Sequence, residues 1–216
     1  MIIAFSGTDG SGKSTQIEQT RHILEKCDKR HTYIWTRGGY TPGFSLAKRI
    51  ARRLLGKRTS TVGGSAKRDQ LLNNSSVSRT WLTIAIWDLI LYYSVYLRYL
   101  NLRFDAVLCD RYIADTELDF ERNYPSSFNP NGVLWKLLKS IAPRPDKHLL
   151  LHVPVHVSQE RSKLKDEPFP DSKETLEFRR SNYLDEKRFP SELFHKIDCT
   201  RSILEVNEEI VQILQL

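Results

Sequence analysis

Short hydrophobic runs recur along the chain, and their length and composition are typical of buried β-strands. These runs are Ile2–Ser6, His31–Trp35, Phe104–Cys109, Lys147–Val153 and His195–Asp198. Segments with helix-like spacing of apolar residues separate them: Lys13–Cys27, Ser45–Leu55, Ser78–Leu100, Val133–Ser140, Ser158–Lys165, Lys173–Arg188 and Ser202–Leu214. Such regular alternation predicts an α/β protein with a five-stranded parallel sheet and helices on both faces.

A glycine-rich octet follows the first predicted strand and leads into the first predicted helix. It reads Gly7-Thr-Asp-Gly-Ser-Gly-Lys-Ser14 and matches the pattern G-x-x-x-x-G-K-[ST]. Backbone N–H groups in such a segment, together with the amino end of a helix, can wrap a phosphate group. The residues predicted to bind a nucleotide are Gly7, Thr8, Asp9, Gly10, Ser11, Gly12, Lys13, Ser14 and Thr15. We expect Lys13 to reach the β- and γ-phosphates and Ser14 to ligate Mg²⁺; the alternative is a glycine-rich turn with an incidental lysine.

A second polar pair, Asp110 and Arg111, directly follows the third predicted strand. In parallel sheets ligands bind beyond the carboxyl ends of the strands, so this pair should lie near the glycine-rich octet. The acid could hold the water shell of Mg²⁺ or receive an acceptor's proton, and the arginine could neutralise a transferring phosphoryl group. The alternative is a structural ion pair or a helix cap. Because the sequence has no Asn-Lys-x-Asp tetrapeptide, a GTPase is disfavoured.

Composition limits the class of protein. With 216 residues, 40% hydrophobic and 27% charged, the chain is typical of one compact soluble domain over residues 1–216. Its three cysteines are far apart and fit neither a disulfide framework nor a zinc site, so we expect them to pack as small apolar groups. Met1–Phe5 is too short for a signal peptide, and Asp88 interrupts the apolar stretch 81–100, so we expect a cytoplasmic protein without a membrane span.

The net charge of +7 suits acidic partners, either phosphorylated small molecules or nucleic acid. The excess cations gather near the predicted phosphate site, which argues against a nucleic-acid-binding protein. Gly56–Arg68 contributes four basic residues, no acidic ones and three glycines. We expect this basic insert (56–68) to be flexible, either as a plain surface insertion or as a segment ordered by an anion.

Several segments resemble the thymidylate kinase family, and they come in the family's order over nearly the whole chain. Phe5–Gln16 is similar to the opening of these enzymes, with an Asp at the third place of the octet and Ser-Thr-Gln after the lysine. Asp110-Arg111-Tyr112 resembles their Asp-Arg-Tyr motif, and Thr36-Arg37-x-x-Gly resembles their loop after the second strand. Leu151–Val157 and Ile197–Ile203 are similar to the fourth and last strands with the segments that follow them.

This resemblance implies a P-loop kinase fold, a three-layer sandwich with a short lid at about residues 160–173. It implies an ATP- and Mg²⁺-dependent nucleoside-monophosphate kinase with small-molecule substrates, and a homodimer packed through the helix at 81–100. In that scheme Asp9 contacts the acceptor's 3′-hydroxyl, Arg37 grips its monophosphate and Arg111 bridges both phosphates. Asp110 organises acceptor oxygens or the metal, directly or through water.

Because Gly10 follows the Asp of the octet, the resemblance also implies cations supplied by the lid. The candidates are Arg161, Lys163 and Lys165, although a solvated basic helix face is the alternative. Residues at i, i+2 and i+4 do not share one helical face.

The sequence departs from the family after Asp110-Arg111-Tyr112. The family continues with serines and then Ala-Tyr-Gln, whereas this chain carries Asp115, Glu117 and Asp119. We expect Asp115 to contact the acceptor; the alternative is that these acids face solvent on a helix. The predicted acceptor is dTMP, and the alternatives are another nucleotide, a nucleoside, another phosphorylated acceptor, or nucleotide binding without transfer.

Overall fold

A computed structural model describes residues 1–36, 75–165 and 170–216. Its sheet has five strands, β1 (Ile2–Gly7), β2 (His31–Trp35), β3 (Ala106–Asp110), β4 (Lys147–His152) and β5 (His195–Asp198). They lie in the order β2-β3-β1-β4-β5, and every neighbouring pair is parallel. The α/β class and the five predicted strands are confirmed, with ends that differ by at most two residues.

Helices connect the strands. They are α1 (Lys13–Lys26), α4 (Ser75–Leu91), the π-helical segment η2 (Tyr92–Leu97), α5 (Arg98–Arg103), α6 (Ile113–Asn123), α7 (Val133–Ile141), α8 (Val155–Leu164), α9 (Lys173–Leu184) and α10 (Ile203–Leu214). The helix predicted over 45–55, the basic insert (56–68), Arg37 and part of the predicted lid lie outside the described residues.

The chain divides into two compact units. The first comprises Met1–Trp35, Leu100–Asp115 and Arg144–Leu216, and the second comprises Thr36–Tyr99 and Thr116–Pro143. The prediction of one domain over 1–216 stays a prediction.

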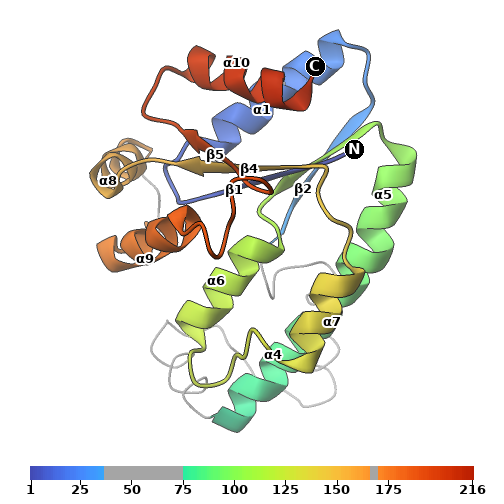
Figure 1. The fold of residues 1–216 in the computed structure, drawn as a ribbon, viewed down its shortest axis with the longest axis vertical. Coiled ribbons are helices and arrows are strands. Elements are labelled where there is room, and N and C mark those ends of the chain that lie inside the picture. The colour runs from blue at the N-terminus through green and yellow to red at the C-terminus, as the bar shows by residue number, and fades with distance from the viewer. Residues whose placement is uncertain (37–74, 166–169) are drawn as a thin grey trace, which may run out of the picture. The chain divides into compact units, whose positions relative to one another are not determined.

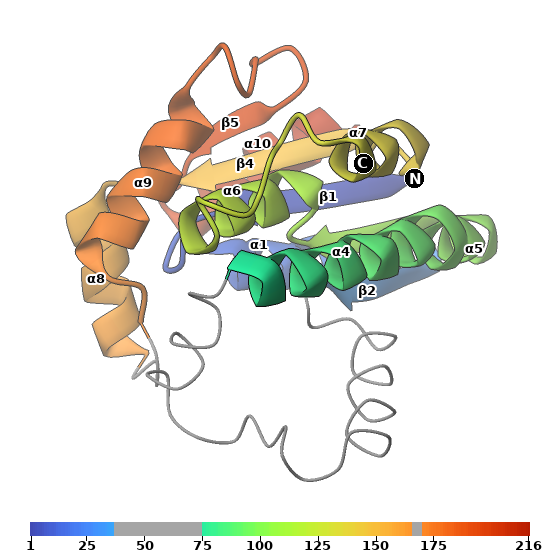
Figure 2. The same ribbon diagram turned by 90° about the horizontal axis from the view of Figure 1, so that it is seen from below.

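The first unit contains the whole sheet. Helices α1 and α10 pack against each other on one face of it (Figure 1). Between this pair and the strands lies a core of fully or nearly fully buried residues: Ile3, Phe5, Ile17, Leu24, Ala106, Leu108, Leu149, Leu151, Val153, Ile197, Cys199, Val206, Ile210 and Leu214. Helices α8 and α9 pack together beyond the carboxyl ends of the strands (Figure 2).

The second unit has a core of aromatic rings contributed by α4, α6, α7 and the segment between the last two. Trp81, Phe120, Tyr124, Phe128 and Trp135 lie with neighbouring ring centroids 5.0 to 6.2 Å apart. Aromatic pairs at such distances stabilise a core beyond the area they bury.

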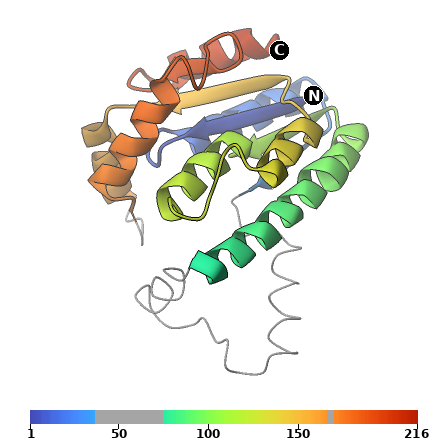
Figure 3. The ribbon, with the colours of Figure 1, turned by 60° about the horizontal axis from the view of Figure 1, so that its bottom comes forward.

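Helices α4, η2 and α5 continue one another as a single long helix (Figure 3). Its stretch Ser78–Arg103 is long enough to cross a membrane and contains an 18-residue window with a mean hydropathy of 1.3, of which 39% is buried in the protein. The core helix of a soluble protein meets the same length and composition criteria. A buried row that includes Leu82, Leu89, Tyr93 and Leu97 agrees with the predicted core helix.

The cysteines are all free, but they differ in their surroundings. Cys109 and Cys199 are buried as expected, whereas Cys27, which follows α1, is exposed. The expectation that all three pack as apolar groups is therefore wrong for Cys27. Burial raises the pKa of Cys199 to about 12, which makes this thiol unreactive at neutral pH.

Candidate active site

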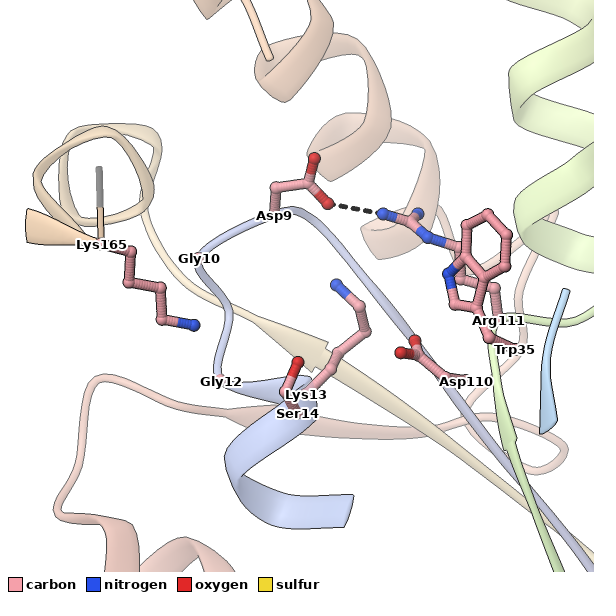
Figure 4. Close-up of a pocket in the computed structure, with 9 residues that line it drawn as sticks. All are labelled: Asp9, Gly10, Gly12, Lys13, Ser14, Trp35, Asp110, Arg111 and Lys165. Carbon is pink, nitrogen blue, oxygen red and sulfur yellow. Dashed lines mark hydrogen bonds and ion pairs between the residues drawn. The ribbon is translucent and has the colours of Figure 1, made fainter. Parts of the chain in front are cut away.

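A polar cavity of about 180 Å³ opens at the carboxyl ends of the strands, within the first unit. The segments that line it are the glycine-rich loop after β1, the start of α1, the ends of β2 and β3, and the end of α8. The lining residues are Asp9, Gly10, Gly12, Lys13, Ser14, Trp35, Asp110, Arg111 and Lys165 (Figure 4). The structure thus brings the two polar motifs singled out in the sequence into one site.

The glycine-rich loop depends on backbone conformations that other residues avoid. Gly10 has φ +74°, and a Cβ built there would lie 2.7 Å from the carbonyl oxygen of Ser158 on α8. Gly12, which caps the amino end of α1, has φ +93°, and a Cβ at this position would have no neighbouring atom within 4 Å. Gly10 is therefore required by the close approach of α8 as well as by its own conformation.

Helix α8 holds this loop through two side chains. Ser158 Oγ donates a hydrogen bond to the carbonyl oxygen of Asp9. The guanidinium of Arg161 donates to the carbonyl oxygens of Gly10 at 3.4 Å and Cys199 at 3.0 Å. Arg161 therefore hydrogen-bonds to the backbone of the loop and does not line the cavity.

The other predicted lid cations differ from each other. Lys163 is exposed and does not line the cavity, whereas Lys165 extends from the end of α8 toward Gly10 and Gly12 (Figure 4). Of the lid cations, only Lys165 contributes to the cavity lining.

We expect Gly10→Ala to lower the free energy of unfolding by about 2 kcal/mol or more, since a left-handed L-residue costs roughly 1–2 kcal/mol before any clash. Gly12→Ala is the matched control, because it imposes a positive φ without a neighbouring atom. Urea unfolding of both variants measures the difference. Equal losses in the two variants would show that α8 does not press on the loop.

Lys13 is folded back onto the loop. Its Nζ donates to the carbonyl oxygens of Gly7 at 3.0 Å and Thr8 at 2.8 Å, and the residue is 8% exposed. Burial, with a smaller contribution from Arg111, lowers the pKa of Lys13 to about 8, although nearby carboxylates act in the opposite direction. An ammonium group so poorly solvated gains strongly from an arriving anion.

Asp9 lies between two guanidinium groups. Arg111 Nη2 is 2.5 Å from Asp9 Oδ1, and Arg179 Nη1 from α9 is 3.9 Å from Asp9 Oδ2. Burial alone would raise the pKa of Asp9, but Arg111, Lys13 and Arg179 lower it to about 2. Asp171 in turn pairs with Arg179. The carboxylate of Asp9 is therefore ionised at neutral pH and holds Arg111 at the cavity.

Asp110 is oriented by a residue that no sequence motif singled out. Tyr33 Oη on β2 donates to Asp110 Oδ2 at 3.1 Å, whereas the buried Oδ1 has no hydrogen-bond partner among the described residues. Strand β2 carries Tyr33 and Trp35 on the same face because their spacing is two. That alternation was the available signal for Tyr33. No motif marked Arg179, whose partner at the cavity, Asp9, lies far away in the sequence.

The orphaned polar atoms fit a nucleotide and a metal. Besides Asp110 Oδ1, the buried hydroxyls of Thr8 and Ser11 lack partners among the described residues, and Ser14 is exposed at the cavity. All of these groups offer oxygen atoms, the ligand type that Mg²⁺ prefers. This metal usually takes one or two ligands from the protein and the others from phosphates and water. In the described part of the chain, no three His, Cys, Asp or Glu residues are grouped so as to hold a metal.

The acids after Asp110-Arg111-Tyr112 are not spread over a solvated face. Asp115 is 2% exposed and Asp119 6% exposed, and neither lines the cavity. Glu117 accepts a hydrogen bond from Trp135 Nε1 at 2.6 Å. The structure places Asp115 in the interior, where both carboxylate oxygens are hydrogen-bonded to the protein, and not on the cavity surface.

Comparison with models of protein families relates nearly the whole chain to a known family. The family model described as thymidylate kinase matches residues 5–210, which is nearly the whole chain. No curated protein matches the chain.

Proposed function

The chain belongs to the thymidylate kinase family, and we propose that it transfers the terminal phosphoryl group of ATP to a nucleoside monophosphate in the presence of Mg²⁺. The proposed acceptor is dTMP, which would give dTDP, in a cytoplasmic setting. The observation that carries this proposal is the single cavity lined by Lys13, Asp110 and Arg111 around the glycine-rich loop.

Each lining residue has a distinct part in the proposed reaction. The loop and Lys13 bind the polyphosphate of ATP. Ser14 and Oδ1 of Asp110, which has no hydrogen-bond partner in the described part of the chain, would hold Mg²⁺, directly or through water. Mg²⁺ supplies charge neutralisation on the phosphate oxygens. Arg111 lines the same cavity, contacts Asp9 of the loop and stabilises charge on the transferring group. Arg37, which lies outside the described residues, remains the predicted contact to the acceptor's phosphate.

Acceptor-dependent release of ADP tests this function. The purified chain is mixed with ATP, Mg²⁺ and one monophosphate at a time, from a panel of thymidine, uridine, cytidine, adenosine and guanosine deoxynucleotides. We expect the highest kcat/KM with dTMP. Slow ADP release that no acceptor accelerates would instead indicate a nucleotide-binding protein without transfer, and preference for another monophosphate would change the substrate but keep the reaction class.

The affinity for ATP is expected to fall as the pH rises above about 8. The ammonium of Lys13, whose pKa is about 8 in the free protein, is charged below that pH and neutral above it. A bound polyphosphate favours the charged form, so the pKa of Lys13 rises on binding. At pH values between the pKa of the free protein and that of the complex, binding is therefore accompanied by uptake of a proton by Lys13. Calorimetric titrations in buffers of different ionisation enthalpy measure this uptake. Lys13→Ala should lack the uptake, and an affinity that stays constant through this range would contradict the expectation.

A further inference from the structure

A buried carboxylate lies beside the turn that carries Arg111, and the proposed reaction does not use it. Asp115, near the start of α6, is 2% exposed. Its Oδ2 accepts hydrogen bonds from Ser6 Oγ and from the backbone N–H of Tyr112, the latter at 2.9 Å. Its Oδ1 accepts one from Tyr183 Oη at 2.6 Å. Three donors satisfy this carboxylate, as burial of such a group requires.

The cluster extends to a neutral histidine. His148 Nε2 on β4 lies 2.7 Å from Ser6 Oγ. Burial lowers the pKa of His148 to about 4, although Asp115 acts in the opposite direction, so the ring is neutral at neutral pH. Because Ser6 donates its hydroxyl proton to Asp115, the Nε2 of His148 carries the hydrogen and donates to Ser6 Oγ. The donors converge on Asp115, and groups of the described residues alone supply hydrogen bonds to both of its carboxylate oxygens.

The backbone next to Asp115 is in an unusual conformation. Arg111 has φ +71°, in the left-handed region that residues other than glycine rarely adopt. Two hydrogen bonds flank this strained position: Arg111 N donates to the carbonyl oxygen of Phe5 at 2.9 Å, and Tyr112 N donates to Asp115. Such a conformation persists only where the surroundings over-determine it.

Asp115 also faces the side chain of Arg111. The distance from Arg111 Nη1 to Asp115 Oδ1 is 3.9 Å, and Arg111 Nη2 is held by Asp9. One guanidinium group therefore lies between a carboxylate of the glycine-rich loop and a carboxylate of α6. Asp9 holds the guanidinium at the far end of the Arg111 side chain, and Asp115 holds the backbone turn from which that side chain extends.

We propose that Asp115 is a positioning residue that holds the turn at Arg111 and Tyr112 in its left-handed conformation, so that the Arg111 guanidinium is fixed at the cavity. This role replaces the predicted direct contact of Asp115 with the acceptor, and it rests on the proposed phosphoryl transfer. Tyr183 donates from α9 to Oδ1 of Asp115, whereas the backbone N–H of Tyr112 donates to Oδ2.

Steady-state kinetics separate this role from its alternatives. We expect Asp115→Ala to lower kcat on the order of 10²-fold, the cost of a misplacement of about 1 Å, with both KM values changed by less than about threefold. Asp115→Asn, which can keep an oxygen on Tyr112 N, should recover most of the lost rate. Tyr183→Phe leaves that hydrogen bond in place and should cause a much smaller loss. A raised acceptor KM with kcat retained would overturn the proposal in favour of a direct contact.

Hydrogen exchange at the Tyr112 amide tests the same role without turnover. Protection is expected in the wild-type protein and in Asp115→Asn, and it should be lost in Asp115→Ala. Free exchange in the wild type, or equal protection in all variants, would overturn the proposal. If the wild type shows protection but transfers no phosphoryl group, the proposed function fails while the hold on the turn stands. A rate loss that only follows the fraction unfolded, measured by circular dichroism, would also overturn the positioning role.

Discussion

Lys13→Ala is expected to lower kcat for phosphoryl transfer on the order of 10²- to 10³-fold, the loss typical when one preorganised donor to a developing charge is removed. In the free protein the Lys13 ammonium is held by the carbonyl oxygens of Gly7 and Thr8 and is almost buried. It is therefore already held at the glycine-rich loop, beside the cavity that a polyphosphate would enter. Coupled measurement of ADP release at saturating substrates gives the loss directly.

The same substitution should leave the fold intact. Burial disfavours the charged lysine, as its lowered pKa shows, so truncation removes a cost together with two hydrogen bonds. Lys26→Ala is the matched control, because Lys26 is exposed in the last turn of the same helix. We expect wild-type kinetics from that control. Wild-type turnover in Lys13→Ala would contradict the assignment of the phosphate site, and so would an equal loss in both variants.

Much of the fold could be predicted because its signals are local. The run Ile2–Ser6 and the octet after it fix a buried strand, a loop and a helix in sequence order. Asp110 and Arg111 could be placed at the same edge of the sheet because the carboxyl ends of parallel strands share that edge. The order β2-β3-β1-β4-β5 has no such signal, since it depends on contacts between strands far apart in the chain.

The helix α6 and the burial of Asp115 show why other parts could not be predicted. Three acids at a spacing of two suggested either a ligand site or a solvated surface. The structure instead satisfies Asp115 with Ser6 and Tyr183, which lie 109 and 68 residues away. Gly10 is a similar case, because its requirement comes from α8, 148 residues further along. Partners at such separations leave no trace in local patterns.

Arg111→Gly is expected to lower kcat on the order of 10³-fold or more, in the range found for arginines that stabilise a transferring phosphoryl group. Arg111 is the one side chain of the β3 turn that reaches both the cavity and Asp9 in the described structure. The free energy of unfolding should change little, because two effects of opposite sign nearly cancel. Glycine relieves a left-handed conformation that costs an L-residue roughly 1–2 kcal/mol. Loss of the hydrogen-bonded partner of Asp9 costs a similar amount, about 1.5–3 kcal/mol, while Arg179 still lies 3.9 Å from Asp9.

Comparison with Arg111→Lys separates charge from geometry. Lysine keeps the positive charge but retains the strained backbone and cannot present two parallel N–H groups. We therefore expect Arg111→Lys to be the more active of the two variants. We expect Arg111→Gly to be the more stable one, because only glycine relieves the strained backbone at this position. Kinetics combined with urea unfolding would check both orders. If Arg111→Gly were the more active variant, or if it lost stability far beyond Arg111→Lys, the arginine would serve to hold Asp9 and the loop, and not the phosphoryl group in transfer.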